Sequence, residues 1–207
     1  MTMDLYLALV MRLATGVFAI QASDRPVDWE HATGYAMAAI YHGTRAGVDP
    51  YELIGIARNE SEFVENRRGP DGKDCGIAQT RTTISKFTCR QLLNSYWLSF
   101  AEAAREMREY ADSCHKRVSA AEYDRCRINY YNSGVHYAKS GVHGAYWLRV
   151  GCFAEAARNA VPIGASCRHV HSKRDIARLL EKRRSLLTLE VPAASASVLA
   201  AIPVSQE

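Results

Sequence analysis

The chain has 207 residues, of which 48% are hydrophobic, and this length suits one domain with extensions. Its 26 basic and 22 acidic residues leave a net charge of +4, which suits an anionic polymer as partner but is also common among ordinary proteins. The sequence contains no zinc-finger spacing, no RNP-like segment and no phosphate loop, so we do not expect it to bind nucleic acid.

The first segment, residues 5–20, is mostly apolar and predicts a helix. Asp4 before this run and Arg12 within it are atypical of a secretory signal, and the run is short for a membrane span. We therefore expect an N-terminal extension over residues 1–25 whose helix packs on this domain or on a partner. A retained signal or a membrane anchor is the alternative. Small and apolar residues at helical spacing then predict a second helix up to about Gly47.

The stretch from residue 47 to residue 63 predicts a short helix with a clear start. Asp49 can accept backbone N–H bonds as cap, Pro50 suits the first helical position, and Glu52 completes a capping box. Glu60 then falls on the apolar face, near the helix C-terminus. Burial and the negative end of the helix dipole both raise the pKa of such a carboxyl, which makes it a candidate proton donor. The alternative is an ordinary surface glutamate where the helix frays.

Further along the chain, turn-forming residues predict a polar loop over residues 64–75. Helical periodicity predicts four more helices, over residues 84–93, 98–118, 120–132 and 146–160. On the second of these, Glu102, Glu106 and Glu109 belong to a charged face that we expect to be solvated surface. Residues 166–190 contain a basic amphipathic helix, and the tail over residues 191–207 is expected to be flexible or ordered by a partner.

Six cysteines form an even set without a Cys-x-x-Cys pair: Cys75, Cys89, Cys114, Cys126, Cys152 and Cys167. An even set fits disulfides in an oxidising compartment, and six buried thiols are the alternative. The sequence cannot choose among the fifteen pairings that six cysteines allow; our working expectation joins neighbours, 75–89, 114–126 and 152–167. The histidines are scattered without a His-Glu-x-x-His pattern, so no metal and no other cofactor is expected.

Three short motifs together resemble the soluble lytic transglycosylases, enzymes with lysozyme-like domains that cleave peptidoglycan. The first is Gly-Val-Asp-Pro-x-x-Leu-x-x-Ile-Ala-x-x-Glu-Ser-x-Phe at residues 47–63, similar to the catalytic helix of this family. Gly76-Ile77-Ala78-Gln79 is similar to the Gly-Leu-Met-Gln segment of the family, and Tyr-Tyr-Asn-Ser-Gly at residues 130–134 is similar to its Ala-Tyr-Asn-Ala-Gly segment. The resemblance covers roughly residues 30–150. Ala78 replaces a bulkier residue, and Ser133 replaces alanine.

The resemblance implies a mainly α, lysozyme-like domain over residues 26–165, with a small loop or β-hairpin at the cleft and helical extensions at both ends. It makes Glu60 the catalytic acid and then base. It also implies a set of substrate-binding residues: Ser61, Gly76, Ile77, Gln79, Tyr130, Tyr131 and Asn132. Of the two tyrosines, Tyr131 is expected near the catalytic carboxyl, and Tyr130 is the neighbouring candidate if the register differs by one residue.

The implied activity is cleavage of the β-1,4 bond between N-acetylmuramic acid and N-acetylglucosamine, with formation of a 1,6-anhydro end. A hydrolytic muramidase that uses Asp71 or Asp74 as a second carboxylate is the first alternative. A non-catalytic structural subunit with a lysozyme-like fold is the second.

The expected partners are peptidoglycan glycan strands and other protein subunits of a bacteriophage virion tail or core, or of an envelope complex. Membrane contact through residues 5–20 also enters this expectation. The expected location is a virion that acts in the periplasm and cell wall, with the bacterial periplasm as the alternative.

Overall fold

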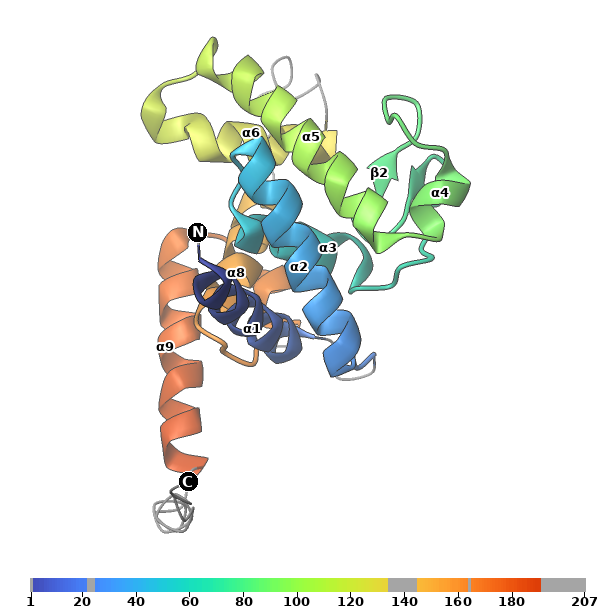
Figure 1. The fold of residues 1–207 in the computed structure, drawn as a ribbon. Helices are drawn as coiled ribbons and strands as arrows, with labels where there is room; N and C mark the ends of the chain where they lie inside the picture. Colours follow the sequence, from blue (N-terminus) through green and yellow to red (C-terminus); the bar gives the residue numbers. More distant parts are fainter. Residues whose placement is uncertain (1, 22–24, 134–144, 164, 191–207) are drawn as a thin grey trace, which may run out of the picture.

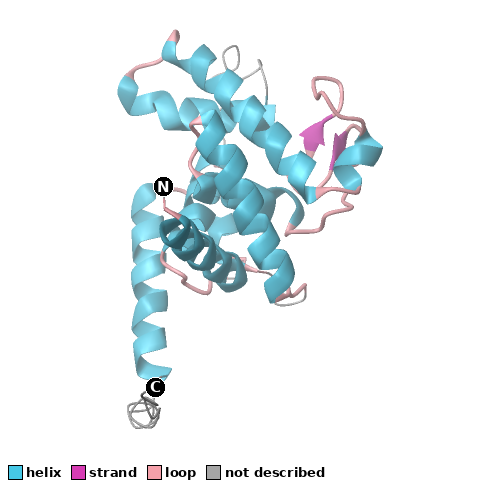
Figure 2. Cartoon of the chain, in the orientation of Figure 1, coloured by secondary structure: helices cyan, strands magenta, loops and turns pink. Residues whose placement is uncertain are grey.

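The computed structural model describes residues 2–21, 25–133, 145–163 and 165–190, and it is mainly helical (Figures 1 and 2). This confirms the mainly α class. The helices are α1 (Met3–Ile20), α2 (Trp29–Ala46), α3 (Pro50–Ser61), α4 (Cys89–Leu93), α5 (Tyr96–His115), α6 (Tyr123–Ser133), α8 (Tyr146–Arg158) and α9 (Lys173–Glu190). Short 3-10 turns cover Ala120–Glu122 and Ser166–His169. The expected tail over residues 191–207 and the last residue of the third motif, Gly134, lie outside the described residues.

A small antiparallel hairpin is formed by β1 (Asp74–Cys75) and β2 (Thr80–Arg81), with Cys75 opposite Thr80. It lies beside α4 and the N-terminal part of α5 (Figure 1). The helix expected over residues 84–93 begins only at Cys89. Thr88 and Gln91 form a reciprocal capping box there, which fixes the start later than Thr83 or Ser85 would have done.

Helix α3 lies at the centre of the core, packed against α2 and α8. The cap and the proline at its start follow the sequence: the Asp49 side chain accepts a hydrogen bond from the Tyr51 N–H at 3.0 Å, and Pro50 occupies the first turn. The expected capping box does not form, because the Glu52 carboxylate pairs with Arg127 instead. Gly55 permits the close contact with α8, because a Cβ there would lie 2.6 Å from the carbonyl oxygen of Val150. The helix is therefore held by close backbone packing along its apolar face.

Helix α1 buries one face and exposes another. Val10, Leu13, Val17 and Ile20 are buried against α2 and α8. The Nε of Arg58 in α3 donates a hydrogen bond to the carbonyl oxygen of Ile20 at 2.6 Å. Among the described residues, α1 alone is long and apolar enough to cross a membrane, and 33% of it is buried in this fold. Large apolar side chains remain exposed on its outer face: Met3, Leu5, Leu7, Met11 and Phe18.

Three disulfides join the neighbouring cysteines, as expected. Cys75–Cys89 links β1 to α4, Cys114–Cys126 links α5 to α6, and Cys152–Cys167 links α8 to the 3-10 turn before α9. Helix α9 packs against the core through Ile176, Leu179 and Leu180, and its C-terminal end extends away from the rest of the molecule (Figure 1). The first two disulfides lie in the elements that surround the candidate site.

Candidate functional site

A cleft with a volume of about 980 Å³ opens between the end of α3, the hairpin and the helices α5 and α6. Its lining includes charged side chains of both signs. The lining residues are Glu60, Arg67, Arg68, Gly69, Pro70, Asp74, Gln79, Arg81, Thr83, Ile84, Glu106, Glu109, Tyr110, Tyr131 and Asn132. All three motifs of the resemblance thus contribute side chains to one cavity, although they lie far apart in the sequence.

Glu60 is the penultimate residue of α3 and lines this cleft. Burial raises its pKa, and the negative charge of Asp74 raises it further. Contacts with the side chains of Tyr146 and Asn59 and the positive charge of Arg149 act in the opposite direction. Because burial is the largest of these effects, the pKa of Glu60 is raised overall, the direction expected from the sequence. A raised pKa favours the protonated form, in which a carboxyl can act as a proton donor.

Helix α8 supplies two side chains around Glu60 that the sequence did not identify as site residues. Tyr146 is buried, and burial together with the charge of Glu60 raises its pKa well above the ordinary value. The Nε of Arg149 donates a hydrogen bond to Oδ1 of Asn59 at 3.2 Å. This bond restrains the side chain of Asn59, the residue before Glu60. Neither residue lies near Glu60 in the sequence. Only the packing of α8 on α3 brings them there.

The segment after β1 forms one side of the cleft. Gly76 has φ of +82°, and a Cβ there would lie 2.6 Å from the carbonyl oxygen of Leu92, so glycine is required. The Nε2 of Gln79 donates to the carbonyl oxygens of Arg67 at 2.9 Å and of Gly76 at 2.8 Å. Both donors of this amide thus hold the loop in place. Its oxygen has no donor within the described part of the chain and is available to a ligand.

Three residues expected to bind substrate lie behind the cleft surface. Ser61 is fully buried and donates a hydrogen bond to the carbonyl oxygen of Ile77 at 2.6 Å. Ile77 belongs to the apolar core, and Gly76 is buried against α4. Their observed role is to join the end of α3 to the segment after β1. They hold Glu60 and Gln79 in place and do not line the cavity.

The two tyrosines of the third motif point in different directions. Tyr131 lines the cleft and donates a hydrogen bond from its hydroxyl to the carbonyl oxygen of Ala78 at 2.9 Å. Asn132 is exposed beside it at the rim. Tyr130 is buried with the Cys114–Cys126 disulfide and accepts a hydrogen bond from Arg117 at 2.8 Å. Tyr131 is therefore the tyrosine that faces Glu60, and Tyr130 has a structural position.

The two aspartates considered as a second carboxylate also separate. Asp74 lines the cleft, with one carboxylate oxygen 3.2 Å from the guanidinium of Arg81. Asp71 lies outside the cavity, 2.9 Å from the same guanidinium. A backbone hydrogen bond from Lys73 lowers the pKa of Asp71. The turn and the ion pair account for Asp71, so Asp74 is the better placed of the two for chemistry in the cleft.

A further carboxyl in the cleft was not expected. The charged face of α5 was predicted to be solvated, but Glu102 and Glu106 are only 1% and 3% exposed. The buried stripe follows Phe100 and Met107 rather than Leu98, which rotates both glutamates inward. Burial, followed by the charge of Glu102, raises the pKa of Glu106 to about 8.

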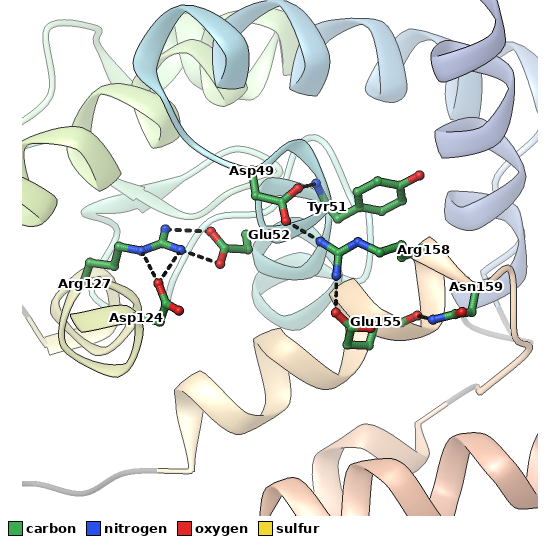
Figure 3. A network of polar contacts seen from close by, with 8 residues as sticks. All are labelled: Asp49, Tyr51, Glu52, Asp124, Arg127, Glu155, Arg158 and Asn159. Atoms are coloured by element: carbon green, nitrogen blue, oxygen red, sulfur yellow. Dashed lines mark hydrogen bonds and ion pairs between the residues drawn. The ribbon is translucent and has the colours of Figure 1, made fainter. Parts of the chain in front are cut away.

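Two ion-pair networks fix the other end of α3 (Figure 3). Arg127 of α6 donates to both carboxylate oxygens of Glu52, at 2.6 and 2.5 Å. Arg158 of α8 bridges Asp49 and Glu155. Bidentate pairs of this kind restrict orientation as well as adding binding energy. The N-terminal half of α3 is thereby tied to two neighbouring helices, at the end of α3 that lies away from Glu60.

Within the described residues, no group of three or more His, Cys, Asp or Glu side chains is placed to hold a metal ion. The cleft presents carboxyl, amide, hydroxyl and guanidinium groups. Comparisons with models of protein families, with curated proteins and with solved structures found no match to this chain.

Proposed function

We propose that this protein is a lytic transglycosylase with a lysozyme-like domain, which cleaves the glycan strands of peptidoglycan. One observation carries the proposal. The carboxyl of Glu60, with a raised pKa, shares a cleft of about 980 Å³ with Gln79, Tyr131 and Asn132, the counterparts of the residues that the resemblance implies. Motifs distant in sequence converge on one cavity, as a shared active site requires.

The proposed reaction uses a single carboxyl twice. Protonated Glu60 gives its proton to the glycosidic oxygen, and the bond from that oxygen to the anomeric carbon of N-acetylmuramic acid breaks. The Glu60 carboxylate then takes the proton of the muramyl C6 hydroxyl, whose oxygen bonds to the anomeric carbon. The products are a 1,6-anhydro end and a free hydroxyl on the neighbouring sugar, and Glu60 regains its proton. A raised pKa serves both steps, since it favours the acid at the start and a strong base afterwards.

The charge at the rim supports an anionic substrate. Arg67 and Arg68 line the cleft, are exposed, and have no ion-pair or hydrogen-bond partner for their guanidinium groups within the described residues. Peptidoglycan offers lactyl and peptide-stem carboxylates, which arginine binds in bidentate fashion. Both guanidinium groups are thus available to such carboxylates.

A hydrolytic muramidase is the second candidate, and the position of Asp74 in the cleft favours it. A hydrolase needs a carboxylate that orients water or forms a covalent intermediate, across the scissile bond from the acid. In this reading Asp74 supplies that group, and Asp74→Asn abolishes cleavage. In the transglycosylase reading Asp74→Asn keeps the activity, within about tenfold.

The test is the mass of the products after digestion of purified peptidoglycan. The transglycosylase reading predicts muropeptides with 1,6-anhydro ends, each lighter by one water than the hydrolysis product. Reducing ends would overturn it in favour of the muramidase. If the native chain leaves the peptidoglycan intact, the cleft belongs to a non-catalytic subunit.

The three disulfides support action in an oxidising compartment, such as the periplasm, or in a virion. We propose local opening of the cell wall by a virion tail or core, or by an envelope complex, as the setting. The exposed apolar face of α1 supports docking to another subunit of such an assembly or contact with a membrane.

A further inference from the structure

The side chain of Glu106 is not explained by the proposed reaction. It comes from the middle of α5, lines the cleft with Glu60, and is only 3% exposed. Its Oε1 atom accepts no hydrogen bond from any described residue. A buried polar atom without a hydrogen bond is costly, and in a native protein it calls for an explanation. An atom of this kind on a cavity wall points to a ligand that completes its hydrogen bonding.

No nearby cation compensates a negative charge on the Glu106 carboxyl. The nearest cation, Arg105, lies 3.9 Å from Oε1, and its closer partners are Glu102 at 2.6 Å and Glu109 at 2.5 Å. Asp74 of β1 adds a further negative charge from across the cleft. With three carboxylates nearby and one shared arginine, the neutral acid is the favoured form of Glu106.

Two tyrosines complete the surroundings. Tyr110, on the next turn of α5, and Tyr131, from α6, both have pKa values that are raised by burial and, after that, by the charge of Glu106. Tyr131 is also affected by Glu60. Tyr131 therefore lies within electrostatic reach of both carboxyls, and all three side chains line the same cleft.

We propose that Glu106 is a second sugar-binding carboxyl, which donates a hydrogen bond to the acetamido carbonyl oxygen of an N-acetylated sugar in the cleft. A neutral carboxyl has one O–H donor, and an acetamido carbonyl oxygen can only accept, so the two groups match. The inference rests on the proposed function because it assumes a glycan in this cleft. It further identifies the acetamido group as the part of the sugar that Glu106 of α5 recognises.

The test measures binding separately from cleavage. Tri-N-acetylchitotriose serves as the probe, with the Glu60→Gln variant as background so that turnover cannot interfere. Glu106→Gln keeps a hydrogen-bond donor and cannot ionise, whereas Glu106→Met has similar size and no donor. Asp112→Asn is the matched control, since Asp112 lies on the same helix, is 64% exposed and does not line the cleft.

We expect Glu106→Met to weaken binding of the probe by about tenfold, the effect of one lost hydrogen bond in a buried site. Glu106→Gln and Asp112→Asn should stay within about twofold of the background. Between pH 6 and pH 9.5 the background should lose affinity as Glu106 ionises, while Glu106→Gln should not. Thermal melts of each variant show whether it remains folded.

Three results would overturn the inference: no binding of the probe, unchanged binding by Glu106→Met, or equal weakening by Glu106→Gln and Glu106→Met. The last result would mean that an ionised carboxylate accepts a hydrogen bond from the sugar. Failure of the proposed function looks different. In that case the native chain leaves peptidoglycan intact, while binding of the probe still depends on Glu106.

Discussion

The two walls of the cleft each carry a buried carboxyl with a raised pKa, but they are built in different ways. The α3 wall presents Glu60 at the end of a helix that is packed on α8 and fixed at its other end by the Glu52–Arg127 pair. The α5 wall presents Glu106 from mid-helix, in a group of charged neighbours. One wall isolates its carboxyl by packing, and the other adds repulsion between like charges. Substitutions on the two walls should therefore have different effects.

The largest effect is expected for Glu60→Gln. Gln is nearly isosteric with Glu but cannot give up a proton, so cleavage of peptidoglycan should fall by about 100-fold or more, the usual contribution of general acid–base catalysis. Release of soluble fragments from purified peptidoglycan measures this, and the melting temperature should stay near that of the native chain.

Glu52→Gln is the matched control on the same helix. Glu52 is also largely buried, and burial raises its pKa, but it pairs with Arg127 outside the cleft. We expect a loss of about 1–3 kcal/mol in the free energy of unfolding with cleavage retained. Equal loss of cleavage in both variants would show that Glu60 acts only through the fold.

Removing one disulfide at a time compares how much each of two disulfides near the cleft contributes to the free energy of unfolding. Cys75–Cys89 and Cys114–Cys126 close segments of similar length, with sequence separations of 14 and 12. Replacement of either pair by serine should cost about 2–4 kcal/mol in the free energy of unfolding. Cleavage should suffer more from loss of the first pair, because Cys75 lies between Asp74 of the cleft and Gly76. Denaturant titration and the cleavage assay measure the two effects, and a greater loss of cleavage from the second pair would contradict this ranking.

A smaller effect is expected for the stability of Glu106→Gln, and it should depend on pH. The ordinary pKa of 4.5 applies in the unfolded chain and about 8 in the folded one, so between these values the folded state binds more protons. Raising the pH through this window therefore lowers the free energy of unfolding of the native chain. Gln lacks this titration, so the variant should gain stability relative to the native chain as pH rises. We expect at least about 1 kcal/mol at pH 8, or about 2–4 °C in melting temperature. A stability difference that is the same at pH 5 and pH 8 would count against the buried acid.

The sequence predicted the α3 wall because the information there is local. Asp49, Pro50 and the apolar periodicity that places Glu60 all lie within one short helix. The Thr88–Gln91 capping box is equally local, so the sequence also contains the signal that starts α4 at Cys89, later than the predicted residue 84.

The α5 wall could not be predicted in the same way. The side of α5 that faces inward depends on how Phe100 and Met107 pack against other helices, and a small rotation decides whether Glu106 is solvated or buried. Tyr146 and Arg149 reach Glu60 only through the long-range packing of α8 on α3. The local sequence pattern therefore located Glu60. Tertiary packing determines which side chains surround Glu60 and whether Glu106 is buried in the same cleft.

Most directly testable is that the pKa of Glu60 is raised above its ordinary value of 4.5 because the cleft wall buries it. A carbon-13 NMR titration of the glutamate side-chain carboxyls, compared between the native chain and Glu60→Gln, identifies the resonance that belongs to this residue. The account predicts a titration midpoint for Glu60 clearly above 4.5. A midpoint at or below 4.5 would show a solvated carboxylate and would contradict its role as proton donor.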